Sequence, residues 1–358
     1  MECSNKKQKA IIFGLGDYFA RNQAEIEQKY NIVALTDNDV NVRKVISQKR
    51  NNVIKSIDIM SHDFDCVVIT ALNATNAYQI SQQVRNFGAS KSSIRIILLE
   101  SLTERFSLEG KKVLEIGCGS GDLVRLIADY CDVESIVGID PGLTSWYGGS
   151  ESKGENWSVQ DGDSMNLEFT DNSFDIVVSY VTFEHIVDIG KALSEIRRIL
   201  KPHGSFYTEI GGIWTSAAGH HWSRPTKNGY YWNEDYMKLI PPWGHLYMSE
   251  SEMQNHLASQ GCSNDLADDI INFIYKSDII NRYSRKNLIS SFMNCGMIVR
   301  GYGEHVTFNR FAYCKPRQSK SELSADIVTK VKAAGYDAED LGVHHMTVHL
   351  EKYAEFLS

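Results

Sequence analysis

The sequence lacks any apolar run near the roughly 20 residues that a membrane-spanning helix needs, so we expect no membrane span. Its first residues, MECSNKKQKAIIFGLGD, contain only a short apolar run broken by glycines and an aspartate, and so predict no signal peptide. The seven cysteines are scattered and include no CxxC pair, which argues against a disulfide framework and a structural zinc site. These absences favour a protein of the reducing cytoplasm.

A basic excess is absent too, because 45 acidic residues against 37 lysines and arginines give a formal charge of −8. This charge disfavours a nucleic-acid partner, since a phosphate backbone normally binds a basic face. The content of 42% hydrophobic and 23% charged residues is that of an ordinary globular protein without low-complexity tracts. A chain of 358 residues usually divides into two domains.

The first hundred residues alternate short apolar strands with amphipathic helical stretches: AIIFGLG, ARNQAEIEQKY, NIVALTDND, FDCVVITAL, AYQISQQVRNFG and SIRIILLE. This alternation predicts a parallel sheet flanked by helices. The polar segment 101–112 has no strand pattern and is predicted to be a connector. We therefore place a boundary near Phe106, with a Rossmann-like domain over 1–105 and a second domain over 106–358.

The alternation restarts at Lys112 with KVLEIGCG, DLVRLIADY, SIVGIDPG, FDIVVSYV, GKALSEIRRIL and GSFYTEIGG. The predicted fold class is therefore α/β, with two doubly wound Rossmann-like domains. Residues 251–286 are predicted to be mainly helical. MIVRGYGEHVTF and MTVHLEKY are two further strands, expected to form an antiparallel pair near the carboxyl end.

A glycine-rich turn follows the strand that begins at Val113, in the sequence VLEIGCGSGDL. Gly117, Gly119 and Gly121 would let the backbone pass close to a ligand at the carboxyl edge of the sheet. Asp140 ends the next strand, about 20 residues on, where an acidic residue would accept hydrogen bonds from ribose hydroxyls. The pattern predicts a nucleotide site.

The string E-x-G-x-G-x-G, which begins at Glu115, resembles motif I of class I S-adenosylmethionine-dependent methyltransferases. Further segments follow in the family's order: Asp140, QDGDSMNLEF, DNSFDIVVSYVTFEHI and LSEIRRILKPHGSFY. The resemblance implies S-adenosylmethionine as cofactor. It implies that Gly117 and Gly119 pass beneath the cofactor's amino-acid moiety and that Asp140 holds the ribose. Asp163 and Ser164 would lie at the adenine edge, and Ser179 and Tyr180 at the methyl side. Glu115 and Gly121 are the other residues predicted to bind the cofactor.

Methyl transfer is an in-line displacement, and a hydroxyl acceptor also needs a base. In this family the base comes from variable segments after the fourth and fifth strands. We predict an acceptor-binding insertion at about 211–290, whose first part is rich in aromatic residues: Trp214, Trp222, Trp232, Trp243, Tyr230, Tyr231, Tyr236 and Tyr247, with Arg224. Such faces suit a small ligand such as a sugar, and they equally suit a small satellite core.

Four histidines are candidate bases. His220, His221 and His245 lie in the aromatic segment, and His185 follows the fourth strand, beside the expected methyl group. Their spacing matches no familiar metal motif, so no metal is predicted.

The first domain has Gly14 and Gly16 after a strand and Asp37 at the end of the next, the skeleton of a dinucleotide site. Phe19 occupies the third glycine position and would obstruct tight packing. The region resembles Rossmann-like modules at the amino ends of bacterial polysaccharide-modifying proteins, which implies a sugar pathway. The alternative is a scaffold or dimerisation domain.

The sequence therefore predicts a cytoplasmic methyltransferase that methylates a hydroxyl of a sugar or a phosphorylated precursor in surface-polysaccharide synthesis. Three alternatives stay open: N-methylation of an amino sugar or phospho-amine, a nicotinamide-dependent sugar oxidoreductase that uses the first domain, and a non-catalytic sensor or scaffold that binds S-adenosylmethionine. The oligomeric state, a homo-oligomer included, also stays open.

Overall fold

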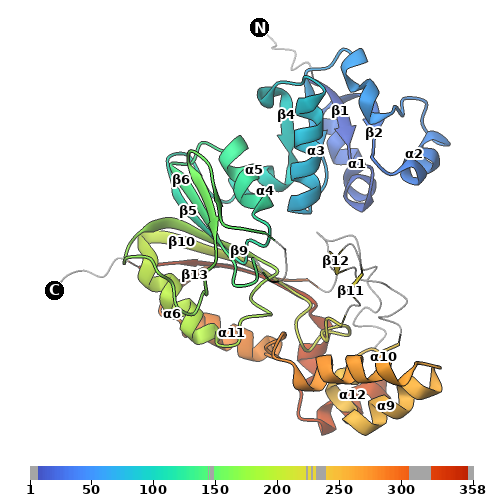
Figure 1. Ribbon diagram of the computed structural model, residues 1–358, viewed down its shortest axis with the longest axis vertical. Helices are drawn as coiled ribbons and strands as arrows, with labels where there is room; N and C mark the ends of the chain where they lie inside the picture. Colours follow the sequence, from blue (N-terminus) through green and yellow to red (C-terminus); the bar gives the residue numbers. More distant parts are fainter. Residues whose placement is uncertain are drawn as a thin grey trace.

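The computed structural model describes residues 7–143, 145, 149–222, 225–226, 229–230, 239–305 and 324–353. These residues form two main sheets and a group of helices (Figure 1). In the described part of the chain no helix is both long and apolar enough to cross a membrane.

The first sheet has four parallel strands in the order β2-β1-β3-β4. Its strands and helices are β1 (Lys9–Phe13), α1 (Asp17–Lys29), β2 (Asn31–Thr36), α2 (Val40–Ser47), η1 (Ser56–Ser61), β3 (Cys66–Ile69), α3 (Ala74–Asn86), η2 (Lys91–Ser93), β4 (Ile94–Ile96) and α4 (Ile97–Thr103). Asn73 caps α3 by accepting a hydrogen bond from the amide of Asn76. Helix α1 contributes to the core on one face and α3 to the core on the other.

The second sheet has eight strands in the order β13-β14-β10-β9-β5-β6-β8-β7. Its strands and the helices between them are β5 (Lys112–Ile116), α5 (Asp122–Tyr130), β6 (Ser135–Ile139), β7 (Ser152–Lys153), β8 (Trp157–Gln160), β9 (Phe174–Tyr180), α6 (Ile189–Ile199), β10 (Leu200–Gly211), α11 (Arg285–Met293), β13 (Ile298–His305) and β14 (His345–Glu351). Helix α5 packs on one face, and α6 and α11 pack on the other.

The α/β fold class is confirmed, and so is the antiparallel strand pair near the carboxyl end. Strand β14 lies between β13 and β10 and runs antiparallel to both. The last strand in sequence is therefore an interior strand of the sheet, which the sequence pattern does not reveal.

One segment differs from its predicted structure. SIRIILLE was expected to be a single strand, but only Ile94–Ile96 is a strand, and the chain continues as helix α4. The physical reason is burial, since Leu98, Leu99 and Leu102 are buried at helical spacing in an apolar core to which α5 also contributes.

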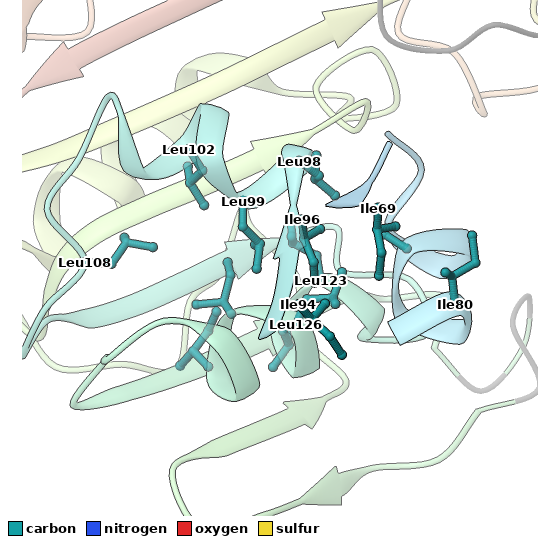
Figure 2. Packing of buried hydrophobic residues seen from close by; sticks show 14 of the residues in the cluster. Ile69, Ile80, Ile94, Ile96, Leu98, Leu99, Leu102, Leu108, Leu123 and Leu126 are labelled. Atoms are coloured by element: carbon teal, nitrogen blue, oxygen red, sulfur yellow. The ribbon is translucent and has the colours of Figure 1, made fainter. Parts of the chain in front are cut away.

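The two sheets share one continuous apolar core. Figure 2 shows Ile94, Ile96 and Leu99 from β4 and α4 beside Leu123 and Leu126 from α5. Because these side chains exclude water together, the first sheet and the α5 side of the second sheet are packed against each other.

A helical lobe follows β10 and has its own core, made of apolar residues from several short helices. Its elements are the hairpin strands β11 (Pro225–Thr226) and β12 (Gly229–Tyr230), the helices α8 (Gly244–Tyr247), α9 (Glu250–Ser259) and α10 (Asn264–Ile271), the π-helical turn η3 (Asn272–Lys276), α12 (Ala325–Ala333) and η5 (Ala338–Gly342). Ser249 and Glu252 form a capping box that starts α9.

Candidate functional site

The glycine-rich turn after β5 has the backbone shape that the sequence predicts. Gly117 and Gly121 have φ angles of 75° and 81°, in the left-handed region that favours glycine. A Cβ at Gly117 would lie 2.1 Å from Oγ1 of Thr182, and one at Gly121 would lie 2.4 Å from Cγ2 of Val159. There is therefore no room for a side chain at these two positions, and the turn lies at the carboxyl edge of the parallel strands.

Asp140 ends the neighbouring strand β6 and holds the turn in place. Its Oδ2 accepts a hydrogen bond from the amide of Gly119 at 3.0 Å, and its Oδ1 accepts one from Gly142 at 2.7 Å. The side chain is buried, at 6% exposure. The carboxylate is thus fixed beside the glycine turn, where the sequence predicts the ribose.

Glu115 lies on β5 directly before the turn and is also buried. Its Oε2 has no hydrogen-bond partner among the described residues. Burial, and then the neighbouring charges of Asp140 and Asp122, raise the pKa of Glu115 to about 8. Three acidic residues around one turn suit a ligand with positive charge, which S-adenosylmethionine carries on its sulfonium and ammonium groups. The residues present therefore fit this cofactor.

Cys118, between two of the glycines, is a packing residue. Its side chain is buried against Gly138, where a Cβ would lie 2.8 Å from that of Cys118. Burial raises the pKa of its thiol well above the usual range, so it is not a reactive thiolate.

Asp163 and Ser164 lie in the turn that follows β8. Oδ1 of Asp163 accepts a hydrogen bond from the amide of Met165 at 2.8 Å, and Ser164 is buried. These contacts fix the shape of the segment predicted to meet the adenine.

Ser179 and Tyr180 end β9, the strand beside β5. The Ser179 hydroxyl donates to the carbonyl of Ile116 at 3.0 Å, which ties the two strand ends together. The Tyr180 ring lies edge-on to Tyr207, with 5.9 Å between centroids. Of this pair, only Tyr180 has a partly exposed side chain at the site.

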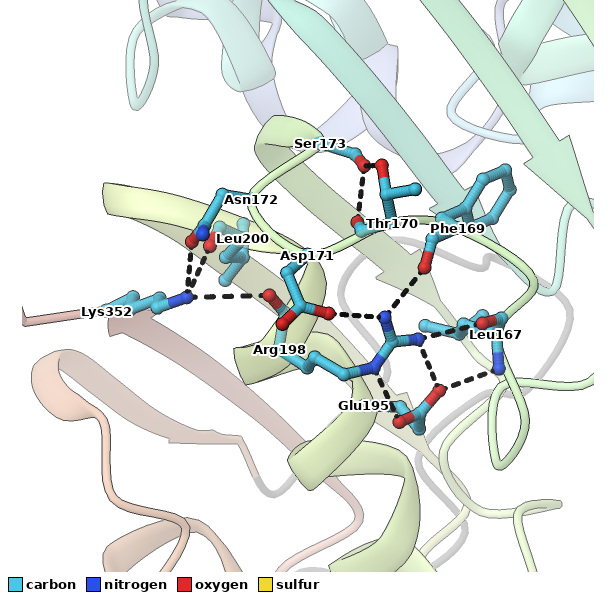
Figure 3. Close-up of polar contacts among 10 residues, drawn as sticks. All are labelled: Leu167, Phe169, Thr170, Asp171, Asn172, Ser173, Glu195, Arg198, Leu200 and Lys352. Atoms are coloured by element: carbon cyan, nitrogen blue, oxygen red, sulfur yellow. Dashed lines mark hydrogen bonds and ion pairs between the residues drawn. The ribbon is translucent and has the colours of Figure 1, made fainter.

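Arg198 on α6 holds the segment that follows the predicted adenine residues (Figure 3). Its guanidinium donates to the carbonyls of Leu167 and Phe169, at 2.8 and 2.7 Å, and to the carboxylates of Glu195 and Asp171. These hydrogen bonds use all five of its N–H donors. The segment is therefore fixed to α6 through one side chain.

His185 lies after β9, three residues beyond Thr182, which contacts the glycine turn. Its Nδ1 lies 2.8 Å from the carbonyl oxygen of Ile279. Because a carbonyl oxygen can only accept, we assign the ring proton to Nδ1, which donates this hydrogen bond. Its Nε2 has no hydrogen-bond partner among the described residues. Burial lowers the pKa of the ring, which is therefore neutral with an available lone pair on Nε2 near neutral pH.

Asn281 clamps the turn that carries His185. Its amide Nδ2 donates to the carbonyls of Phe183 and Ile186 at 2.6 and 2.9 Å, and its backbone N–H donates to the carbonyl of Glu184 at 3.0 Å. The segment before α11 thus supports the turn at several points.

The other candidate histidines are buried at the base of the lobe. His245 Nε2 lies 2.7 Å from the carbonyl of Trp214, and His221 lies between the carbonyls of Gly219 and Gly211, at 2.9 and 3.2 Å. His220 Nδ1 accepts a hydrogen bond from the amide of Trp222. Burial lowers the pKa of His221 to about 3 and of His245 to about 4.

The structure brings His221 and His185 together, with 5.5 Å between ring centroids, whereas His220 and His245 pair with each other at 5.3 Å. No group of three or more histidine, cysteine or acidic side chains arranged for a metal occurs among the described residues.

Two buried acidic residues near the site were missed by sequence reasoning. Glu184 is 2% exposed, neither carboxylate oxygen has a hydrogen-bond partner among the described residues, and burial raises its pKa to about 8. Glu209 on β10 accepts from the Tyr207 hydroxyl at 2.7 Å and lies 3.8 Å from His345. The available signal was a charged residue within an otherwise apolar run, in TFEHI and in TEIGG.

Three of the aromatic residues predicted for acceptor binding are core residues of the lobe. Trp214, Trp222 and Trp243 are at most 5% exposed and pack together with the apolar faces of the lobe helices. For these three the satellite-core interpretation holds. Arg224, Tyr231, Trp232, Tyr236 and the side chain of Tyr230 lie outside the described residues.

The first domain repeats the acid-to-turn contact of the second. Asp37 accepts a hydrogen bond from the amide of Leu15 at 2.7 Å, as Asp140 does from Gly119. The Phe19 side chain is buried in the core on one face of the sheet. A bulky residue therefore takes the place of the third glycine.

Comparison with known families identifies the central part of the second domain. Residues 114–208 match the family described as "Methyltransferase domain". A methyltransferase domain is thus confirmed over these residues, and with it S-adenosylmethionine as its cofactor, whereas the bounds 106–358 stay a prediction. Residues 6–95 match a different family, described as "C2185-like, N-terminal", which does not confirm the predicted link to polysaccharide modification.

Individual relatives share mainly this central region. A sterol 24-C-methyltransferase of Aspergillus fumigatus is 36% identical over 103 residues, which are 27% of this chain and 27% of that one. A demethylmenaquinone methyltransferase of Lactobacillus johnsonii is 26% identical over 197 residues, 52% of this chain and 72% of that one. The chain thus spans about a quarter of the length of the first of these relatives.

Among solved structures, an S-adenosylmethionine-dependent methyltransferase from Mesorhizobium loti matches with a TM-score of 0.39 and 13% identity. The match covers 70% of this chain and 96% of that one.

Proposed function

We propose that the protein transfers a methyl group from S-adenosylmethionine to a small polar acceptor. The observation that carries the proposal is the glycine turn held by Asp140, within the region that matches the methyltransferase family. Glu115, the turn glycines and Asp140 would hold the donor, Asp163 and Ser164 would meet its adenine, and Ser179 and Tyr180 would line its methyl side. The bound cofactor supplies an electrophilic methyl group.

His185 is the residue that we propose as general base. Its Nδ1–H is oriented by the carbonyl of Ile279, so the opposite nitrogen can accept a proton from an acceptor hydroxyl. Thr182 supports this position, because it contacts both the glycine turn and, through its carbonyl, the amide of His185 at 2.8 Å. His220, His221 and His245 stay as further candidates, and their contacts with backbone groups favour a role in positioning the lobe.

For the acceptor we propose a hydroxyl of a sugar or phosphorylated glycan precursor, in line with a base that takes up a hydroxyl proton. The relatives named above act, by their names, on a sterol and on demethylmenaquinone, so a sterol and a quinol belong in the same test.

The donor site is tested by calorimetric titration of the full chain with S-adenosylmethionine. We expect micromolar binding that Asp140→Ala weakens at least about tenfold, since a charged hydrogen-bond acceptor is lost. Asp37→Ala is a matched control, because it removes the equivalent acid of the first domain. Absence of binding, or an equal loss in both variants, would sink the proposal.

The acceptor is tested by transfer of labelled methyl groups to a panel of sugar nucleotides, amino sugars, a sterol and a demethylated quinol. Product on hydroxyl-bearing sugars alone supports the proposed acceptor. Transfer only to amines would instead establish N-methylation, and donor binding without any transfer would favour a sensor.

A further inference from the structure

A pocket of about 620 Å³ lies where the first sheet meets the second, away from the methyl-donor turn. We call it the junction pocket. It runs along β4, the edge strand of the first sheet, and its other walls are α4 and the end of α5. Ile96 and Leu99 give it an apolar wall, and Tyr130 adds an aromatic one. A pocket of this volume is large enough for a metabolite.

Arg95 is held in this pocket by the edge strand itself. Its Nη1 donates to the carbonyls of Ser92 and Ile94, at 2.7 and 3.1 Å. Nε and Nη2 have no hydrogen-bond or ion-pair partner in the part of the chain that the structure describes. One edge of the guanidinium is thus anchored, and the opposite edge presents the parallel N–H donors that bind a carboxylate or phosphate in bidentate fashion.

The charges around the pocket leave an excess of positive charge, although the whole chain carries −8. The Lys91 ammonium lies 4.0 Å from the Asp129 carboxylate, and the Arg85 guanidinium lies 3.5 Å from it. One negative charge therefore faces two positive charges. Glu100, the acidic residue of the wall, is paired with Lys29 at 2.8 Å. Arg95 adds a positive charge that no described carboxylate neutralises.

We propose that the junction pocket binds a small molecule with an oxyanion and an apolar or aromatic body. Arg95 holds the oxyanion in bidentate fashion, Lys91 adds a second positive charge, and the body lies against Ile96, Leu99 and Tyr130. The ligand binds both sheets at once, since its anion is held by β4 and its body reaches the end of α5. This site is separate from the methyl-donor site and does not depend on the proposed activity.

The test is calorimetric titration of the full chain with three probes that share a ring: phenyl phosphate, benzoate and neutral benzyl alcohol. We expect a Kd of about 1 mM or tighter for at least one anion and no measurable binding of the alcohol. If phenyl phosphate binds more tightly than benzoate, the natural ligand carries a phosphate. If benzoate binds more tightly, the natural ligand carries a carboxylate. Equal binding of the alcohol, or no binding of either anion, overturns the proposal.

Substitutions inside and outside the junction pocket distinguish binding in the pocket from binding elsewhere on the surface. Arg95→Gln should weaken anion binding about 10- to 100-fold, whereas Arg21→Gln, an exposed arginine on α1, should leave it unchanged. Asp140→Ala should also leave it unchanged, which distinguishes the pocket from the donor site. If Arg95→Gln lowers the melting temperature, Lys91→Gln repeats the test without touching the edge strand. If Arg21→Gln weakened anion binding as much as Arg95→Gln, the anions would be attracted by the general surface charge and not by the junction pocket.

Discussion

We expect Glu115, as a proposed donor-site residue, to couple donor binding to the release of a proton. Its pKa is raised to about 8 in the free protein, and a cationic ligand beside it favours the carboxylate. Binding should therefore release a proton below pH 8, so affinity for S-adenosylmethionine should rise with pH from 6 to 8, by at most roughly tenfold per unit.

Calorimetry in two buffers of different ionisation enthalpy measures this release directly. In Glu115→Gln the pH dependence should flatten. If the variant keeps the same slope, the proton belongs to another group, such as the amino group of the ligand itself.

His185 should affect the chemical step more than donor binding. His185→Gln removes the proposed base, and we expect kcat to fall by about 10²- to 10⁴-fold with the donor Kd unchanged. Because burial lowers the pKa of His185 below 6.5, the wild-type rate should fall as the pH drops through that lowered pKa. His62→Gln, at a partly exposed histidine beside the first sheet, is the control. An unaffected kcat would remove His185 from the mechanism.

Among the structural elements, α6 fixes through Arg198 the segment that follows the residues proposed to meet the adenine. Arg198→Lys keeps the charge but cannot reach the carbonyls of Leu167 and Phe169 and both carboxylates together. We expect a loss of about 1–2 kcal/mol in unfolding free energy and weaker donor binding. Urea unfolding and titration measure the two effects. Arg197→Lys, whose guanidinium lies against Gly296, should change neither.

The segment before α11 positions the turn after β9. Asn281→Ala removes two hydrogen bonds to that turn, at Phe183 and Ile186, and should loosen the contact between His185 and Ile279. Nitrogen NMR of the histidines should then show a single Nδ1–H tautomer of His185 in the wild type and averaging in the variant. Asn272→Ala, at an exposed position on η3, should keep the wild-type spectrum. An unchanged tautomer in Asn281→Ala would refute the positioning role.

At the scale of the molecule, buried histidines join the lobe to the second sheet. Burial lowers the pKa of His221 to about 3 and of His245 and His344 to about 4. The unfolded chain takes up protons below about pH 6.5, where the folded protein still does not. Stability is therefore complete above this pH and falls as the pH decreases from 6.5 toward 4.

Each such histidine should lower the free energy of unfolding by roughly 1 kcal/mol at pH 5.5 relative to pH 7.5. Urea unfolding at the two pH values measures the loss, and His245→Gln should reduce it. Equal stability at both pH values would show that these side chains become protonated in the folded state.

Much of the donor half could be predicted from local sequence. Gly117, Gly119 and Asp140 could be placed because a strand, a glycine-rich turn and an acid at the next strand end are local features, and their contact follows from neighbouring parallel strands. The acceptor half could not be predicted in this way. His185 contacts the carbonyl of Ile279, and Glu209 lies 3.8 Å from His345, each distant in sequence, and no periodicity encodes such a contact.

The sequence by itself determined the α/β class, the alternation of strands and helices, and the glycine-rich turn, because these depend on residues close together in the chain. Only the tertiary structure decided that β14 enters the sheet beside β10, that Trp214, Trp222 and Trp243 are core residues, and that α4 packs on α5 to form the junction pocket. The physical reason is that burial is a property of the whole packing. An aromatic side chain has the same sequence signal whether it covers a ligand or fills a core.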